Sequence, residues 1–266
     1  MKKFWFILTA LVATCFLVAC SGSQGVSPKT IKEKKKIVVA TESEFAPFEF
    51  KSLVNGKDTL VGADIELAKA IGEKLGVKVE FSVMSFDNVL ANVQSGKADI
   101  AIAGISVTDE RKKVYDFSDS YYTSENVVIV KKDKVNDYTS TDSLAKQTVG
   151  TQKGSVQETV AKKQIPKASV VSLSSNGEMI NELKSGQLQA VVLEKAIAEG
   201  YIAQNDDLTL ANFNLKSDGT DAYAVATRKG SDDLLKEINA VIKETKDSGK
   251  FDQWLKESLP DRKSVV

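Results

Sequence analysis

From Ile37 onward the chain alternates short apolar runs with helical segments, and this alternation constrains the fold more than any other feature. The expected strands cover residues 37–40, 77–83, 98–103, 126–130, 148–149, 169–173, 190–193 and 222–227. The expected helices cover residues 62–75, 87–94, 155–163, 178–184, 194–204 and 232–248. Strands that alternate with helices of about 10 to 15 residues favour an α/β fold with parallel sheets built from βαβ units.

An internal echo suggests that the chain contains two such units. Residues 95–102 (SGKADIAI) resemble residues 185–192 (SGQLQAVV), which lie 90 positions further on. In each copy a predicted helix ends, a glycine follows at a C-cap position, and an apolar strand begins. Two similar units at this separation favour two α/β lobes, although glycine is common after helices and a chance match stays open.

Charged side chains follow both echoed strands. The first strand leads to Arg111, and the second ends at Glu194. Ligands of open α/β sheets bind beyond the carboxyl ends of the strands, so a ligand between two lobes would meet both side chains. A guanidinium suits a carboxylate and a carboxylate suits an ammonium, so the pair matches the zwitterion of an α-amino acid. Taken alone, each of these residues is more often an ordinary surface charge.

Composition narrows the possible classes of function. The 266 residues include 36 Lys and Arg, 36 Asp and Glu, two Cys and no His. A balanced charge argues against nucleic-acid binding. Without His, neither a Ser-His-Asp triad nor a His-ligated zinc site can form. Two Cys cannot build a disulfide framework or a four-cysteine site, and we expect no metal and no cofactor.

The first twenty residues have the pattern of a secretion signal. Lys2 and Lys3 precede an apolar run over residues 4–19, which is shorter than the about 20 residues of a membrane span. The run ends in Leu-Val-Ala-Cys, which resembles the lipobox of bacterial lipoproteins. That resemblance implies a signal peptide over residues 1–19 and a lipid on Cys20, anchoring an extracytoplasmic body to the cell membrane. The alternatives are a plain signal peptide or an uncleaved anchor.

Residues 20–36 are expected to form a flexible tether. They are rich in Ser and Gly at first and then in Lys, with no apolar periodicity. The lysines are expected to be solvated, with contact to anionic lipid head groups as the alternative. No later run is long and apolar enough to cross a bilayer.

Several motifs along the chain resemble those of one known family. They are TESEFAPFEF (41–50), VGADIEL (61–67), AGISVTDER (103–111), DFSDSYY (116–122), VGTQKGSVQE (149–158) and VLE (192–194). Together they resemble the polar amino acid-binding proteins of ABC importers, the bacterial solute-binding proteins of family 3. The resemblance implies a two-lobed periplasmic-binding-protein fold of type II, with a ligand cleft between lobes joined by two hinge strands. Lobe 1 would comprise residues 37–124 and 222–266, and lobe 2 residues 125–221.

The resemblance also assigns roles to side chains of the first lobe. Phe45 and Phe86 resemble the aromatic residues that sandwich the ligand's side chain, where flat faces suit aliphatic stems and attract cations. Gly104 and Ser106 resemble the carbonyl and hydroxyl groups that receive the ligand's ammonium. Arg111 resembles the residue that holds the α-carboxylate.

The second lobe would complete the site. Backbone N–H groups near Gly154 and Ser155, at a helix N-terminus, would assist Arg111 with the carboxylate. Glu194 takes the position of an acidic residue that binds the ammonium, and Gln157 adds a polar contact. The same motifs supply two further candidate ligand-binding residues, Ala103 and Gln152.

Glu42 is expected to select the ligand's side chain. It matches an acidic position that faces the distal end of the ligand, so a basic amino acid (arginine, lysine, ornithine or histidine) is favoured, with glutamine next. Glu44 adds a second acid that either faces solvent or reinforces the preference for a cation. Lys153 would oppose a cationic ligand if it pointed inward, and we expect it to face solvent.

The expected mechanism is capture by hinge closure. The amino acid bridges the lobes, shifts the population toward a closed form, and is delivered to the membrane subunits of a permease. We expect a monomer without enzymatic activity. The alternative is a periplasmic dehydratase on the same fold, in which Glu42, Glu44 or Glu194 would perform acid–base chemistry.

Overall fold

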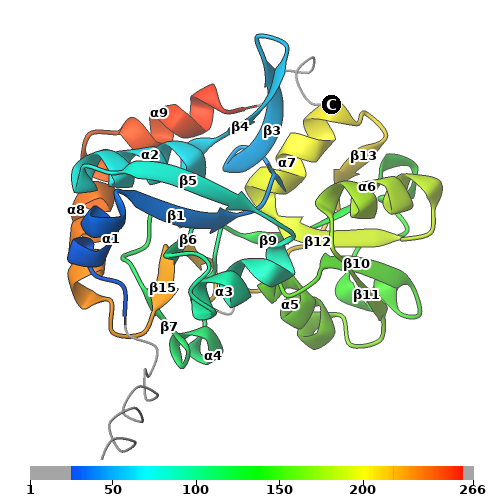
Figure 1. Ribbon diagram of the computed structural model, residues 1–266. Helices are drawn as coiled ribbons and strands as arrows, with labels where there is room; N and C mark the ends of the chain where they lie inside the picture. The colour runs from blue at the N-terminus through cyan, green and yellow to red at the C-terminus, as the bar shows by residue number, and fades with distance from the viewer. Residues whose placement is uncertain (1–24, 218, 260–266) are drawn as a thin grey trace, which may run out of the picture.

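Two five-stranded β-sheets, one in each lobe, organise the chain (Figure 1). The computed structural model describes residues 25–217 and 219–259, so the predicted signal peptide 1–19 and Cys20 lie outside the described residues. The first sheet has the order β5 (Lys78–Val83), β1 (Lys36–Thr41), β6 (Ile100–Ala101), β15 (Ala226–Arg228), β7 (Tyr115–Phe117). The second has the order β11 (Ser169–Leu173), β10 (Thr148–Gln152), β12 (Ala190–Glu194), β9 (Asn126–Lys131), β13 (Leu208–Leu210).

Both sheets are mixed, which corrects the prediction of parallel sheets. Strand β1 pairs in parallel with β5 and β6, and β10 pairs in parallel with β11 and β12. The other two strands of each sheet are antiparallel to their neighbours. The βαβ pattern therefore describes three strands of each lobe. The antiparallel strands β9 and β15 lie directly after the two chain segments that cross between the lobes.

Helices cover both faces of each sheet (Figure 1). In the first lobe, α2 (Ala63–Leu75), α8 (Asp232–Asp247) and α9 (Lys250–Glu257) pack together, and α3 (Phe86–Gln94) packs on β1, β6 and β15. A short helix, α4 (Asp109–Lys112), contacts β7. In the second lobe, α5 (Val156–Gln164), α6 (Asn176–Ser185) and α7 (Lys195–Gln204) pack on the sheet, and two 3-10 helices cover Lys132–Lys134 and Thr141–Leu144. Among the described residues, no helix has the length and apolarity to cross a bilayer.

Two short strands connect the lobes. Strand β8 (Tyr122–Thr123) runs toward the second lobe and pairs antiparallel with β14 (Ala222–Tyr223), which returns from it. Aromatic rings fill this junction: Phe48 lies 4.9 Å from Tyr122 and 5.4 Å from Tyr223 between ring centroids. The main hydrophobic core passes through these rings and includes buried side chains of both sheets.

A three-stranded hairpin unit, absent from the sequence-based prediction, lies above the junction (Figure 1). It consists of β2 (Glu44–Phe45), β3 (Glu49–Val54) and β4 (Lys57–Val61), paired antiparallel. Gly62 ends it with a φ of 128°, and a Cβ there would lie 2.0 Å from the Phe48 carbonyl oxygen. Only glycine fits this close approach, which starts α2 directly after the hairpin.

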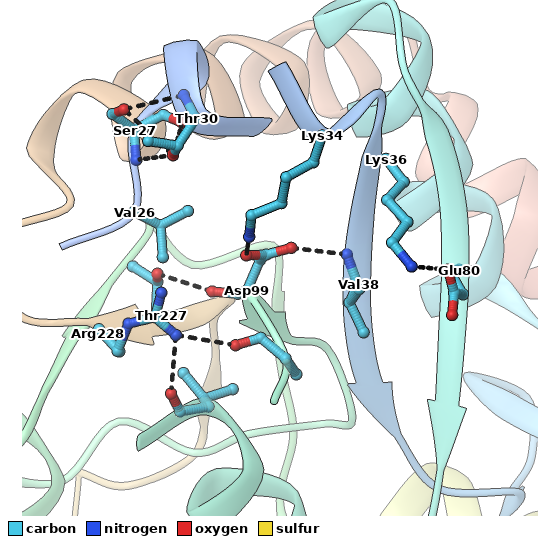
Figure 2. Close-up of polar contacts among 12 residues, drawn as sticks. Val26, Ser27, Thr30, Lys34, Lys36, Val38, Glu80, Asp99, Thr227 and Arg228 are labelled. Atoms are coloured by element: carbon cyan, nitrogen blue, oxygen red, sulfur yellow. Dashed lines mark hydrogen bonds and ion pairs between the residues drawn. The ribbon is translucent and has the colours of Figure 1, made fainter. Parts of the chain in front are cut away.

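The prediction of a flexible tether over residues 20–36 is wrong for residues 25–36, the part that the structure describes. Helix α1 (Pro28–Lys34) begins with a capping box between Ser27 and Thr30, and Ile31 is fully buried. Figure 2 shows how this segment is held: Lys34 forms a 2.8 Å ion pair with the buried Asp99. The buried side chains of Val26 and Ile31 and the ion pairs of Lys34 and Lys36 hold a lysine-rich segment that has no visible periodicity.

The echo between the two halves is a genuine structural repeat. In the first lobe the Val38 N–H donates to the Asp99 carboxylate (2.9 Å), and in the second the Thr148 N–H donates to the Gln189 side-chain oxygen (3.0 Å). Helices α3 and α6, each with a serine at the N-cap position, follow the outer strand of each β-α-β-α-β unit. The segments from α3 to β6 and from α6 to β12 are therefore equivalent, with an offset of 90 positions.

Candidate ligand-binding site

Equivalent residues of the two lobes meet across the interface between them. Glu42 follows β1, and Gln152 ends β10, the equivalent strand. The Gln152 Nε2 donates to the Glu42 Oε2 at 3.0 Å, and both side chains are buried. The other carboxyl oxygen of Glu42 is buried without a hydrogen-bond partner. Burial, reinforced by the nearby charges of Glu44 and Glu194, raises the pKa of Glu42 to about 8, against the lowering effect of the Gln152 bond.

Arg111 connects the two lobes at another point of the same interface. Its Nη1 donates to the Ser106 carbonyl oxygen at 2.7 Å, and its Nη2 donates to the Gly154 carbonyl oxygen of the second lobe at 3.0 Å. The Thr108 hydroxyl caps α4 and accepts the Arg111 backbone N–H. Burial lowers the pKa of Arg111 to about 10, while Glu194 opposes that shift. A guanidinium has five N–H donors, so these two bonds leave donors for a carboxylate.

Phe86, the first residue of α3, lies beside Arg111. The guanidinium carbon is 5.8 Å from the centroid of the Phe86 ring, within the range of a cation–π contact. The ring is buried, so the two predicted site residues form one unit in which an aromatic face supports the cation.

Glu194 is buried at the end of β12, where it precedes α7. Burial raises its pKa to about 7, and its own backbone N–H, the nearby Gln157 and Tyr223 side chains and the charge of Arg111 act in the opposite direction. Gln157 also donates to the Asn126 side chain at 2.7 Å. The predicted residues Arg111, Gln157 and Glu194 are therefore electrostatically coupled in one place.

Phe45 packs directly against Gly104. Gly104 has a φ of 54°, and a Cβ there would lie 2.5 Å from the Phe45 ring. The Gly104 N–H donates to Asp64 at 3.1 Å, and the Tyr121 hydroxyl donates to the same Asp64 oxygen at 2.8 Å. The turn that presents the Gly104 carbonyl is therefore fixed from behind by a buried carboxylate.

A second buried carboxyl group lies behind this turn. Burial raises the pKa of Asp64 to about 6, and burial together with the charge of Asp64 raises the pKa of Glu49 well above its usual range. Glu49 is fully buried on β3. A protonated Glu49 can donate to Asp64, which lowers the cost of burying two acids side by side.

The remaining predicted residues occupy supporting positions. Ser155 is buried at the N-cap of α5, and its hydroxyl donates to the Gln152 carbonyl oxygen at 2.7 Å. The side chain of Ala103 is fully buried in the core beneath α3, so only its backbone can contribute to a site. Ser106 is buried and bridges to Tyr223 through the backbone.

Two further contacts flank this region and join the lobes. On one side, Lys153 forms a 2.9 Å ion pair with Asp87, and the Lys153 side chain is 60% exposed, in agreement with the expectation that it faces solvent. On the other side, Glu44 accepts hydrogen bonds from the Ser175 hydroxyl (2.5 Å) and the Gly177 N–H (3.1 Å) at the start of α6. The carboxylate of Glu44 is therefore hydrogen-bonded to the opposite lobe. A cavity of about 350 Å³ next to Glu44 has walls from both lobes.

Several residues of this region escaped sequence reasoning: Asp64, Asp87, Asn126 and Tyr223. Asp64 lies within a recognised motif, but nothing in the sequence distinguishes it from a surface acid.

Two α/β lobes joined by a pair of strands, with one guanidinium and several carboxyl groups where they meet, define a two-lobed binding protein. Comparison with known proteins agrees. Residues 37–259 match the family of bacterial extracellular solute-binding proteins, family 3, and the chain belongs to that family.

Three relatives illustrate the similarity. The arginine-binding extracellular protein ArtP of Bacillus subtilis is 34% identical over 261 residues, which cover 96% of this chain and 97% of ArtP. The crystal structure of the amino acid ABC transporter substrate-binding protein AbpA from Streptococcus pneumoniae, bound to L-arginine, has a TM-score of 0.85 and 49% identity, covering 88% of this chain and all of that one. The ancestral amino acid-binding protein AncCDT-1, a precursor of cyclohexadienyl dehydratase, is 34% identical with a TM-score of 0.78, covering 88% and 99%.

Proposed function

We propose that this protein captures a basic amino acid, with L-arginine first, for an ABC importer. The observation that carries the proposal is Glu42: a buried carboxyl group that has one oxygen on Gln152 and one unpaired. Its raised pKa means that ionisation is costly in this environment, and a cationic side chain beside it would remove that cost. The arginine-binding relatives support the same choice of ligand.

The backbone ends of the ligand are assigned to the opposite part of the interface. We infer that Arg111, held against Phe86, binds the α-carboxylate together with N–H groups at Gly154 and Ser155. Glu194 and the Gly104 carbonyl bind the ammonium. Phe45 packs along the aliphatic stem, while Gln152 and Gln157 orient the carboxylates of Glu42 and Glu194.

Capture would proceed by hinge closure about β8 and β14. The hydrogen bonds of Glu44 and Arg111 to the opposite lobe, and the ion pair of Lys153, can form only when the lobes are together. A ligand that bridges the lobes favours that arrangement over an open one. The closed form would then be recognised by the permease subunits, with a monomeric binding protein as the working unit.

We further propose that Cys20 carries a lipid that anchors the protein on the extracytoplasmic face of the cell membrane. The lipobox at residues 17–20 supports this. Replacing Cys20 by Ala should release the protein from the membrane fraction into the medium or periplasm, whereas a membrane fraction that keeps the variant would show that another segment anchors it.

The dehydratase alternative has one point in its favour, the similarity to a precursor of cyclohexadienyl dehydratase. We propose that the chain is a binder and not an enzyme, because the named relative is itself an amino acid-binding protein and each of the acids considered already has a partner within the protein.

A thermal shift series of the soluble body against the common amino acids tests the binding proposal. A ligand at 100 times its dissociation constant adds about 2.7 kcal/mol of stability. We expect arginine to give the largest shift. Recovery of intact arginine after long incubation would support binding over turnover, and the absence of any shift with every amino acid would refute the proposal.

A further inference from the structure

Asn176 is a buried polar side chain without a partner. It is the first residue of α6 and is fully buried, and neither its Oδ1 nor its Nδ2 has a hydrogen-bond partner among the described residues. Burying an amide without hydrogen bonds is destabilising, so such a group calls for a role that the protein's own contacts do not supply.

The structural repeat shows where Asn176 lies. Helices α3 and α6 bury side chains at equivalent positions: Phe86, Val89 and Val93 in the first, and Asn176, Met179 and Leu183 in the second, each 90 positions later. Asn176 is thus the counterpart of Phe86, the ring that supports Arg111. The repeat places an amide in one lobe where the other lobe has an aromatic ring against the predicted ligand site.

The contacts around the two helix starts follow the same symmetry. At the start of α3, Asp87 lies against Gly154, whose added Cβ would be 3.3 Å from the Asp87 Cα. At the start of α6, Gly177 donates to Glu44 at 3.1 Å. Asp87 is the counterpart of Gly177, so the two helix starts approach the opposite lobe on two flanks. Phe86 lies on the flank of Arg111, and Asn176 lies on the other.

The flank of Asn176 is where the end of the ligand's side chain belongs if Arg111 holds the carboxylate. Both sequence neighbours of Asn176 bind Glu44, which follows Glu42 by two residues. An amide oxygen accepts a hydrogen bond from a guanidinium or ammonium, as a carboxylate does, without adding another charge.

We propose that Asn176 contacts the end of the amino acid side chain, and that its Oδ1 accepts a hydrogen bond from an N–H of a cationic group there. This inference rests on the proposed function, because it specifies which part of the bound amino acid the residue contacts. It adds to Glu42 a second, neutral acceptor that distinguishes cationic from shorter or neutral side chains.

The test compares Asn176→Leu and Asn176→Asp with the parent, using calorimetry with L-arginine and L-glutamine and melting of the ligand-free proteins. Asn176→Leu removes the acceptor at similar volume, so we expect arginine to bind at least tenfold more weakly. The ligand-free variant should melt at the same temperature or higher, because an unpaired buried amide has been removed. Asn176→Asp keeps the acceptor, so we expect arginine binding within threefold of the parent and a higher ratio of arginine to glutamine affinity.

Asn181→Leu on the exposed face of the same helix is the matched control and should leave binding unchanged. Parent-like arginine affinity in Asn176→Leu would overturn the inference. So would an equal loss for both ligands accompanied by a lower melting temperature, because that pattern marks a residue needed only for folding. If the parent itself bound no amino acid, the proposed function would fail instead, so the two failures are distinguishable.

Discussion

Replacing Glu42 by Gln tests the electrostatic basis of ligand selection, because the two side chains differ by little more than an ionisable oxygen. In the ligand-free protein the pKa of Glu42 is raised from 4.5 to about 8. At about 1.4 kcal/mol per pKa unit, the shift corresponds to on the order of 5 kcal/mol of unfavourable free energy for the ionised form.

The sign of the resulting pH dependence follows from linkage. A group whose pKa is raised by folding stabilises the protein fully below its unfolded pKa of 4.5, and that contribution is lost as the pH rises through about 8. The ligand-free parent should therefore lose stability between pH 5 and pH 9, and Glu42→Gln should lose several kcal/mol less. Glu194, whose pKa is raised to about 7, titrates in both proteins, and its charge acts on Glu42, so the difference reports Glu42 together with its interaction with Glu194.

Bound arginine should offset the free-energy cost of ionising Glu42, and this effect should be present in the parent and absent from Glu42→Gln. A guanidinium next to Glu42 favours the carboxylate, so binding at pH 7 releases a proton and the affinity rises toward pH 8.5. Losing one partner of a buried, hydrogen-bonded charge pair costs about 2–5 kcal/mol, so we expect arginine to bind Glu42→Gln about 100-fold more weakly at pH 8.

Calorimetry in two buffers of different ionisation enthalpy measures both the affinity and the protons released. Glu80→Gln, an exposed glutamate on β5, is the control and should behave like the parent. Equal arginine affinity and equal proton release in the parent and Glu42→Gln would refute the assignment of Glu42 to the ligand's cationic end.

Three further substitutions test separate parts of the molecule. Arg111→Ala should weaken the binding of every amino acid at least 100-fold without unfolding the protein. Calorimetry measures the affinity and circular dichroism checks the fold; unchanged affinity would show that another group holds the carboxylate. Glu44→Ala should speed ligand release several-fold in stopped-flow experiments, whereas Glu44→Gln, which keeps an acceptor for α6, should release more slowly than Glu44→Ala; equal rates in all three proteins would remove Glu44 from closure. Asp99→Asn should weaken the ion pair with Lys34 but keep the bond to the Val38 N–H, so protease should cut near α1 faster; parent-like resistance would show that burial of α1 suffices.

The fold could be predicted where periodicity carries the information. Helix α2 and strand β11 were located within a residue or two because their apolar spacing reflects burial against a sheet. Helix α1 and the hairpin strand β3 were missed for the opposite reason. Only Ile31 is buried in α1, and in β3 only Glu49 and Phe50 are buried while the apolar Leu53 and Val54 are exposed, so no strand periodicity is visible.

Candidate site residues could be predicted only where they lie in recognisable sequence motifs. Arg111 and Glu194 lie in motifs that resemble those of a known family, so the sequence identifies them as candidates. Asp64 and Tyr223 act through burial, and burial of a single polar residue depends on elements far away in the chain. Glu44 was left open because its partners lie at the start of α6, more than a hundred residues later.

Comparing the two halves separates residues that build the fold from those that make the site. Where the copies make the same contact, as Asp99 and Gln189 do in accepting a backbone N–H from the neighbouring strand, the residues serve the fold of each lobe. Where they differ, the differences meet at the interface: Glu42 faces its counterpart Gln152, and the place of Phe86 is taken by Asn176. An amino acid is itself asymmetric, with a zwitterion at one end and a side chain at the other. Under the proposed assignments, the difference between the two copies matches this asymmetry, with Phe86 and Arg111 at the zwitterion and Asn176 and Glu42 at the end of the side chain.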